Sequence, residues 1–356
     1  MASIAELDQN FKVETKLSVD DIVFYDTKNE PFAIYGVFFE GDRYRRLPES
    51  VAKEVSAGVY GLHTNTAGGR VRFMTDSPYV AIHAKMPAVH KMPHFPFSGS
   101  IGLDLYVYWD GKERFYEGII PPFDVTDGYE GIVRFETAEM REITINFPLY
   151  SDLSDLYIGV REGSQILAAS PYRDLKPIVY YGSSITQGGC ASRPGNAYEA
   201  IIGRRLNVDH VNLGFSGNAL AEVAIAEYIK GLPMSVFVYD YDHNSPNADF
   251  LAKTHERMFR IIREANPDLP IVILSRPKCR LLEEEKRRLE VVKQTYRNAI
   301  ARGDKNVYFI TGAGLMAMCG DDGVIDRCHP SDLGFYSMAT VLGDVLEKIV
   351  GKREER

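Results

Sequence analysis

The spacing of apolar residues changes once along the chain, between Leu167 and Pro177, and this change constrains the fold more than any other feature. Before it, apolar and polar residues alternate, as in the run from Glu142 to Phe147. After it, short apolar runs alternate with amphipathic stretches of helical length. Half-buried strands pack against another sheet, whereas short apolar strands between amphipathic helices pack beneath those helices. We therefore predict two domains, residues 1–172 and 173–356, which is reasonable for a chain of 356 residues.

The first half reads as a series of β-strands separated by turns. The strand-like runs are Phe32–Phe38, Val71–Met74, Tyr79–Ala84, Leu103–Trp109 and Tyr157–Glu162, together with the alternating run described above. Asp110-Gly111, directly after one of these runs, is a strong hairpin signal. The pattern offers no long amphipathic helix in this half, so we expect an all-β sandwich of the jelly-roll type.

The second half alternates strand-like and helix-like segments. The expected strands are Ile178–Tyr181, Val211–Leu213, Val236–Tyr241, Ile271–Leu274 and Val307–Ile310. The expected helices are Ala197–Leu206, Leu220–Ile229, Ala248–Glu264, Leu281–Ala301 and Ser331–Ile349. Strict alternation predicts a parallel sheet covered on both faces, here a flavodoxin-like three-layer α/β/α domain. Sites in such domains lie beyond the carboxyl ends of the strands.

The composition of the chain argues against some classes of binding partner and indicates a cellular compartment. A net charge of -8 argues against nucleic acid, and no apolar run is long enough to span a bilayer. The four cysteines, Cys190, Cys279, Cys319 and Cys328, have neither the spacing of a zinc site nor that of a disulfide framework. With no signal-peptide pattern at the start, we expect a cytoplasmic protein, although a processed and secreted form is also compatible. The oligomeric state stays open.

Polar residues follow three of the expected strands and precede the last helix. Ser184 follows the first strand, Gly217 the second and Asn244 the third. A serine hydroxyl needs a base, and the base needs a partner that fixes its tautomer; His329 and Asp326, three residues apart, could supply both. The backbone N–H groups of Ser184 and Gly217 and the amide of Asn244 could stabilise an oxyanion.

These blocks, in this order, resemble the SGNH (GDSL-type) hydrolase superfamily. Ser184, within GSSI, stands at the serine of the GDSL block, although serine replaces the aspartate of its second position. Gly217 and Asn244 match the glycine and asparagine blocks, with DYDH replacing the usual glycine-rich lead-in to the latter. Asp326 and His329 match the terminal DxxH block. The resemblance runs from about residue 176 to the C-terminus.

The first half resembles a companion of such hydrolases. Gly102–Tyr106, with the sequence GLDLY, is similar to the GxDLY signature of an N-terminal sandwich domain. Such pairs resemble bacterial carbohydrate esterases. The resemblance implies a serine esterase that removes short acyl groups, with acetyl expected, from a small-molecule or oligosaccharide ester and needs no metal or organic cofactor. An acyltransferase that uses the same acyl-serine is an alternative, and a non-catalytic carbohydrate-binding protein is a third interpretation.

Several further residues are candidates for substrate binding. His90 and His94 are four residues apart, but Pro93 prevents the helix that would place both on one face, which argues against a metal. We expect their loop to reach over the second domain and to form part of the substrate pocket. His243 is expected in the pocket wall. Arg193 and Arg276 could contact substrate, and solvated loops explain these two arginines equally well.

Overall fold

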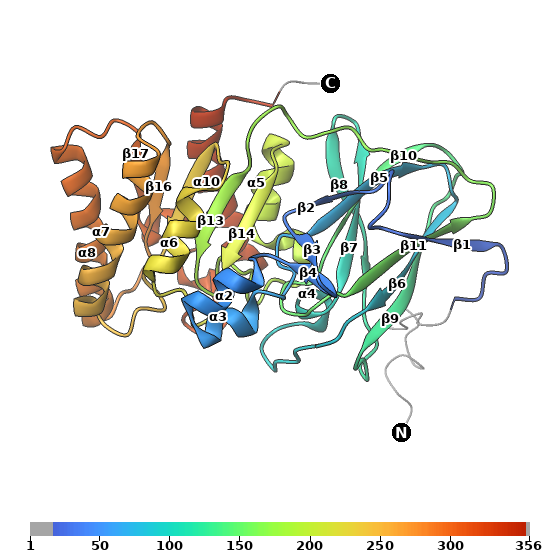
Figure 1. Ribbon diagram of the computed structural model, residues 1–356, viewed down its shortest axis with the longest axis horizontal. Helices are drawn as coiled ribbons and strands as arrows, with labels where there is room; N and C mark the ends of the chain where they lie inside the picture. Colours follow the sequence, from blue (N-terminus) through green and yellow to red (C-terminus); the bar gives the residue numbers. More distant parts are fainter. Residues whose placement is uncertain (1–16, 354–356) are drawn as a thin grey trace.

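The computed structural model describes residues 17–353 and places the two halves side by side (Figure 1). The first half contains two antiparallel sheets. One sheet has the order β1 (Ile22–Asp26), β11 (Asp155–Arg161), β6 (Tyr79–Lys85) and β9 (Gly128–Arg134). The other has the order β12 (Ile166–Leu167), β5 (Arg70–Thr75), β10 (Arg141–Asn146), β7 (Leu103–Trp109) and β8 (Lys112–Ile119), with β2 (Ala33–Tyr35) paired to β5. A small hairpin consists of β3 (Phe38–Glu40) and β4 (Arg43–Arg45).

The period-two pattern explains how the two sheets pack. In β10, Ile143 and Ile145 are fully buried, and Ile143 pairs with Phe73 of β5. They share one apolar cluster with Val80 and Ile158 of the opposite sheet. The expected hairpin joins β7 to β8, where Asp110 and Gly111 have φ angles of 50° and 73°. Both angles are positive, as a two-residue turn between twisted strands requires.

The first half also contains three short helices that the sequence pattern did not show. Helices α2 (Glu49–Val55) and α3 (Ala57–Leu62) interrupt it, and the short α4 (Phe97–Ser100) precedes β7. Each has seven residues or fewer, too short to establish a helical period in the sequence. Ala52 and Val59 are buried in the core of the second half, so α2 and α3 cover that half although the first half encodes them. Figure 1 shows them beside α6.

The second half is a five-stranded parallel sheet, and its order agrees with the prediction. The strands run β14 (His210–Gly214), β13 (Ile178–Gly182), β15 (Val236–Asp240), β16 (Ile271–Leu274) and β17 (Val307–Ile310). This 2-1-3-4-5 order is that of flavodoxin-like folds. The helices are α5 (Tyr198–Leu206), α6 (Val223–Lys230), α7 (Ala248–Ala265), α8 (Glu283–Ala301), α9 (Gly312–Leu315) and α10 (Asp332–Val350), with 3-10 turns η2 (Pro194–Asn196) and η3 (Gly320–Gly323). Within residues 17–353, none of the helices combines the length and apolarity needed to cross a bilayer.

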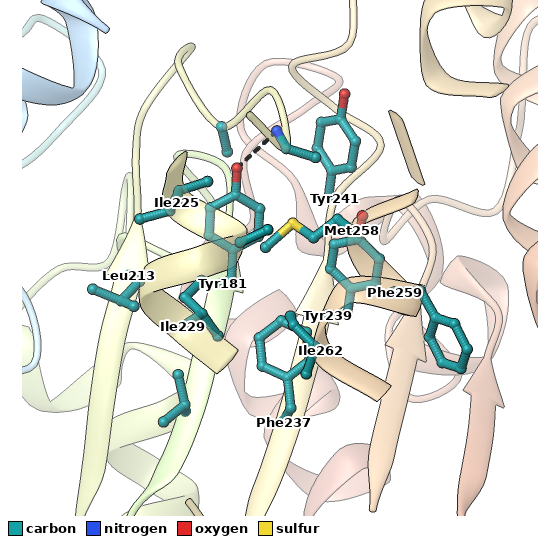
Figure 2. Packing of buried hydrophobic residues seen from close by; sticks show 14 of the residues in the cluster. Tyr181, Leu213, Ile225, Ile229, Phe237, Tyr239, Tyr241, Met258, Phe259 and Ile262 are labelled. Carbon is teal, nitrogen blue, oxygen red and sulfur yellow. Dashed lines mark hydrogen bonds between the residues drawn. The ribbon is translucent and has the colours of Figure 1, made fainter. Parts of the chain in front are cut away.

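Helices cover both faces of this sheet, so its strands are apolar on both sides. Val179 and Tyr181 of β13 pack with α6 and α7, whereas Ile178 and Tyr180 pack with α5 and α10. Figure 2 shows Tyr181 and Tyr239 among the aliphatic side chains of the first face. The hydroxyl of Tyr181 accepts a hydrogen bond from the backbone N–H of Ala221 at 2.9 Å, so this buried polar atom is satisfied.

A buried arginine joins the two halves. Arg46, in the segment between β4 and α2, is almost fully buried and donates to backbone carbonyl oxygens. Its acceptors include Asn65 at 2.6 Å and Gly214, the last residue of β14, at 2.6 Å. These contacts fix the first half against the carboxyl edge of the parallel sheet, the edge at which such folds place their sites.

Candidate active site

Ser184 lies in a tight turn two residues beyond β13. The backbone N–H of Gly189 donates to the carbonyl oxygen of Ser184 at 2.7 Å, which closes the turn. Gly182 is the last residue of β13, and a Cβ there would lie 2.2 Å from Oγ1 of Thr186, so the position has no room for a side chain. That hydroxyl donates to the buried carboxylate of Asp240 at 3.0 Å. The chain therefore holds Ser184 at the carboxyl edge, with its side chain mostly buried.

The structure brings Ser184, His329 and Asp326 together. Oγ of Ser184 lies 2.8 Å from Nε2 of His329, and Nδ1 of the same ring lies 2.8 Å from Oδ2 of Asp326. Because Nδ1 faces a carboxylate, it carries the ring proton, and Nε2 is left to accept the proton of the serine hydroxyl. The nucleophile, base and orienting carboxylate of a serine hydrolase have this arrangement.

The loop that carries His329 orients it through the same carboxylate. The other oxygen of Asp326, Oδ1, accepts the backbone N–H of His329 at 2.8 Å. Arg327, between them, has a φ of 69°, which lets the loop turn back on itself. Desolvation disfavours the ionised form of Asp326, but the hydrogen bonds from the backbone and ring of His329 outweigh it and lower the pKa of the carboxyl group.

Three candidate hydrogen-bond donors lie in the turns that follow β13, β14 and β15 at this edge of the sheet. In residues 17–353, the backbone N–H groups of Ser184 and Gly217 have no acceptor. Gly217 has a φ of 69° and open space where a Cβ would stand, so its backbone conformation, rather than a close contact, favours glycine there. Nδ2 of Asn244 donates to the carbonyl oxygen of Phe215 at 2.9 Å, which orients the amide and leaves its second N–H available.

Comparison with known families agrees with this geometry. Residues 175–347 match the GDSL-like lipase/acylhydrolase family, and residues 22–166 match a family described as the N-terminus of SGNH-hydrolase-type esterases. The chain therefore combines a GDSL-like lipase/acylhydrolase domain with the N-terminal domain of SGNH-hydrolase-type esterases. No curated protein matches it.

Solved structures share the two-part architecture of this GDSL-like hydrolase. One, described as a GDSL-like lipase from Bacteroides ovatus, is 29% identical with a TM-score of 0.84 and covers 94% of this chain and 100% of its own. The salicylyl-acyltransferase of a tetracycline biosynthetic pathway is 18% identical with a TM-score of 0.75 and has the same coverage. A family two carbohydrate esterase from Clostridium thermocellum, solved with cellohexaose, is 16% identical with a TM-score of 0.60 and covers 90% of this chain and 99% of its own.

Two polar residues that support the site were not singled out from the sequence. Oε1 of Gln187 accepts the backbone N–H of Ser216 at 3.0 Å, and its Nε2 donates to Asn65 of the first half at 3.1 Å. The hydroxyl of Tyr150, also in the first half, donates to the carbonyl oxygen of Ser184 at 3.2 Å. These bonds fix the turns of the GDSL and glycine blocks relative to each other. Gln187 lies only three residues after Ser184, but nothing local in the sequence identifies its partners.

The histidine loop of the first half reaches the hydrolase site, as the sequence suggested. The ring of His94 lies 5.8 Å from the ring of His329, between centroids, and its side chain is exposed. The neighbouring Phe95 is buried and packs edge-on against Tyr150 at 5.0 Å, which anchors the loop. His90 is exposed and makes no ring contact with His329. The loop therefore brings one histidine of the pair to the site.

Arg193 is turned away from the site and toward the sandwich. Its guanidinium donates to Oδ2 of the buried Asp104 at 3.0 Å and to the hydroxyl of Tyr106, and it lies 3.8 Å from the ring centroid of Phe115. All these partners belong to the first half. Since its donors are engaged there, the structure favours a positioning role for Arg193 over contact with substrate.

His243 and Arg276 lie behind the catalytic loop. His243 is buried, and its Nδ1 accepts from Nε of Arg276 at 3.0 Å and lies 3.6 Å from Sγ of Cys328. Burial, reinforced by the charge of Arg276, holds the pKa of His243 well below its ordinary value, so the ring is neutral. The guanidinium of Arg276 also bonds Glu285. These contacts support Cys328, the residue next to His329. Neither His243 nor Arg276 is exposed, as a side chain that binds substrate would be.

Proposed function

We propose that the protein is a serine esterase in which Ser184 is the nucleophile, His329 the general base and Asp326 the group that orients it. One observation carries the proposal: the 2.8 Å contact between Oγ of Ser184 and Nε2 of His329, continued by the 2.8 Å contact between Nδ1 and Asp326. Such a relay converts a weakly nucleophilic hydroxyl into one that attacks an ester.

The reaction follows from these positions. Oγ of Ser184 attacks the ester carbonyl while its proton passes to Nε2 of His329. The N–H groups of Ser184, Gly217 and Asn244 stabilise the oxyanion of the tetrahedral intermediate. His329 then gives the proton to the departing alcohol, leaving an acyl-serine. Water attacks this ester, His329 takes its proton, and collapse returns the proton to Ser184 and releases the acid.

A short acyl group on a carbohydrate is the proposed substrate. Neighbours with the same two-part architecture support it, since one is a carbohydrate esterase solved with cellohexaose and another is an acetyl xylan esterase from Butyrivibrio proteoclasticus. The exposed His94 beside His329 gives the first half a side chain that can reach groups beyond the ester itself. We therefore expect an O-acetylated oligosaccharide to be hydrolysed.

Acyl transfer is the second candidate, favoured by the likeness to a salicylyl-acyltransferase. It would use the same acyl-serine, with an alcohol in place of water. Supplying sugars or alcohols during turnover distinguishes the two reactions, because acyl transfer forms a new ester and hydrolysis releases only the acid.

A non-catalytic carbohydrate-binding protein, the third candidate, would leave Ser184 unreactive toward a fluorophosphonate probe.

Replacing Ser184 tests the proposal directly. Ser184→Ala should abolish turnover of p-nitrophenyl acetate and labelling by a fluorophosphonate, while the melting temperature stays near that of the wild type. Ser235→Ala, at the opposite edge of the sheet where β15 begins, is the matched control and should retain both. Acetate release from a panel of acetylated glycans then identifies the sugar that carries the acyl group. Wild-type turnover by Ser184→Ala would refute the mechanism.

A further inference from the structure

Three metal-ligating side chains meet at the mouth of the site. One donor atom from each of His94, Cys190 and His329 lies within 4.8 Å of the other two. Two imidazoles and a thiol form a donor set that zinc and related thiophilic ions prefer. The mechanism proposed above uses only His329 of the three in the chemical steps, places His94 beside it and gives Cys190 no role.

The spacing fits an ion after small side-chain movements. In a tetrahedral zinc site, ligand atoms lie about 2.0 to 2.3 Å from the metal and therefore about 3.3 to 3.7 Å from one another. The observed upper limit of 4.8 Å exceeds this by an amount that a change in side-chain torsion covers. Nδ1 of His329 is bound to Asp326, so Nε2 is the atom that faces the other ligands. A carboxylate behind a ligating imidazole is the usual outer support of a zinc histidine.

The chain holds the other two donors in place before any ion arrives. Cys190 is buried and has a φ of 76°, a conformation that non-glycine residues rarely adopt. The carbonyl oxygen of Ser192 accepts a hydrogen bond from Oγ of Ser98 at 2.6 Å, which fixes this strained segment against the first half. His94 is held by the buried Phe95 that follows it, while its own exposed ring leaves an entry path.

We propose that His94, Cys190 and His329 form an inhibitory site for a thiophilic divalent metal ion such as Zn²⁺. Binding releases the thiol proton of Cys190 to solvent and forms one metal–sulfur and two metal–nitrogen bonds, with water or Oγ of Ser184 in the fourth position. The lone pair of Nε2 is then shared with the metal, and His329 no longer accepts the proton of Ser184. The predicted loss of turnover rests on the proposed function, whereas the predicted binding does not.

Metal binding is measured first, without reference to activity. Co²⁺ added to the reduced wild-type protein should give the near-ultraviolet charge-transfer band of a cobalt–thiolate bond, and Zn²⁺ should displace it. Cys190→Ser should lose this band, and His94→Ala should weaken Zn²⁺ binding in calorimetry by about 10-fold or more. Cys328→Ser is the matched control, because its thiol is next to His329 in sequence but contacts His243. A band that persists in Cys190→Ser and disappears in Cys328→Ser would overturn the site.

Turnover is measured second. Zn²⁺ should inhibit hydrolysis of p-nitrophenyl acetate reversibly, with activity restored by a chelator, and Cys190→Ser should need at least about 10-fold more Zn²⁺ for half-inhibition. An active enzyme without a cobalt–thiolate band would refute the metal site and leave the esterase intact. A protein with the band but without activity on any ester would refute the esterase and leave the metal site intact. The melting temperatures of Cys190→Ser and Cys328→Ser should be near that of the wild type, so that the loss of the band reports the loss of a ligand and not unfolding.

Discussion

Asp104 of β7 accepts a hydrogen bond from the guanidinium of Arg193, a residue in the segment that follows the nucleophile, at 3.0 Å. The same carboxylate accepts the backbone N–H of Gly195 at 2.9 Å and the amide of Asn146 at 2.8 Å. Asp104 is fully buried in a strand that is otherwise apolar there. The aspartate of the GLDLY motif therefore joins the sandwich to the hydrolase half.

Replacing Asp104 should destabilise the protein. Asp104→Ala leaves the donors of Arg193, Gly195 and Asn146 without their acceptor, and breaking a buried pair in this way costs about 3 kcal/mol or more. Chemical denaturation measures the loss. Asp42→Ala, which removes an exposed ion pair with Arg43, should cost about 1 kcal/mol or less. Equal losses in the two variants would mean that the Asp104 contacts do not stabilise the fold.

Replacing Asp326 should slow the reaction without unfolding the protein. Asp326→Asn keeps the shape of the side chain but no longer offers a carboxylate to Nδ1 of His329, so the ring can adopt the wrong tautomer. Loss of this group in a serine triad costs up to about 10⁴-fold in kcat. Stopped assays with p-nitrophenyl acetate, compared with the exposed Asp322→Asn, measure the effect. A loss of only a few-fold would show that Asp326 does not orient the base.

Replacing Asn244 should lower kcat with little change in KM. The hydrogen bond to the carbonyl oxygen of Phe215 orients its amide, and the remaining N–H acts only when the oxyanion forms. Removing one such donor costs about 10²- to 10³-fold in kcat. Asn266→Ala, at the far end of α7, is the control and should retain wild-type kinetics. An increase in KM alone after Asn244→Ala would indicate substrate binding in place of transition-state stabilisation.

Local patterns predicted the five strands and the five longer helices of the second half, but not the four-residue α9 or the 3-10 turns η2 and η3, which are too short to show a period. The strand Ile271–Leu274 and the strand Val307–Ile310 agree residue for residue with the expectation. The blocks of Ser184, Gly217, Asn244 and Asp326–His329 also have local signals, and the sheet order brings them to one edge.

Contacts between distant segments could not be read in the same way. A buried polar residue such as Asp104 or Gln187 must have a partner, but its sequence does not say which one. Asn65, which accepts from Gln187, lies 122 residues away. For the same reason, the role of Arg193 could not be read from the sequence, which allowed both a substrate ligand and a residue of a solvated loop. The structure pairs Arg193 with Asp104.

Replacing His94 should lower kcat/KM for the natural ester more than for a generic ester. The exposed ring of His94 lies beside that of His329, so it can contact the sugar of an acylated carbohydrate but has little to contact in a small aryl acetate. For an acetylated oligosaccharide, His94→Ala should lower kcat/KM by about 10-fold, chiefly through KM, which corresponds to about one hydrogen bond or ring contact. For p-nitrophenyl acetate, the change should be about 2-fold or less, since the relay from Ser184 through His329 to Asp326 stays intact. His90→Ala is the matched control, because His90 belongs to the same loop and is exposed but lies outside ring contact with His329. Equal effects of His94→Ala on both substrates would place His94 in the chemistry common to all esters and contradict a role in selecting the carbohydrate.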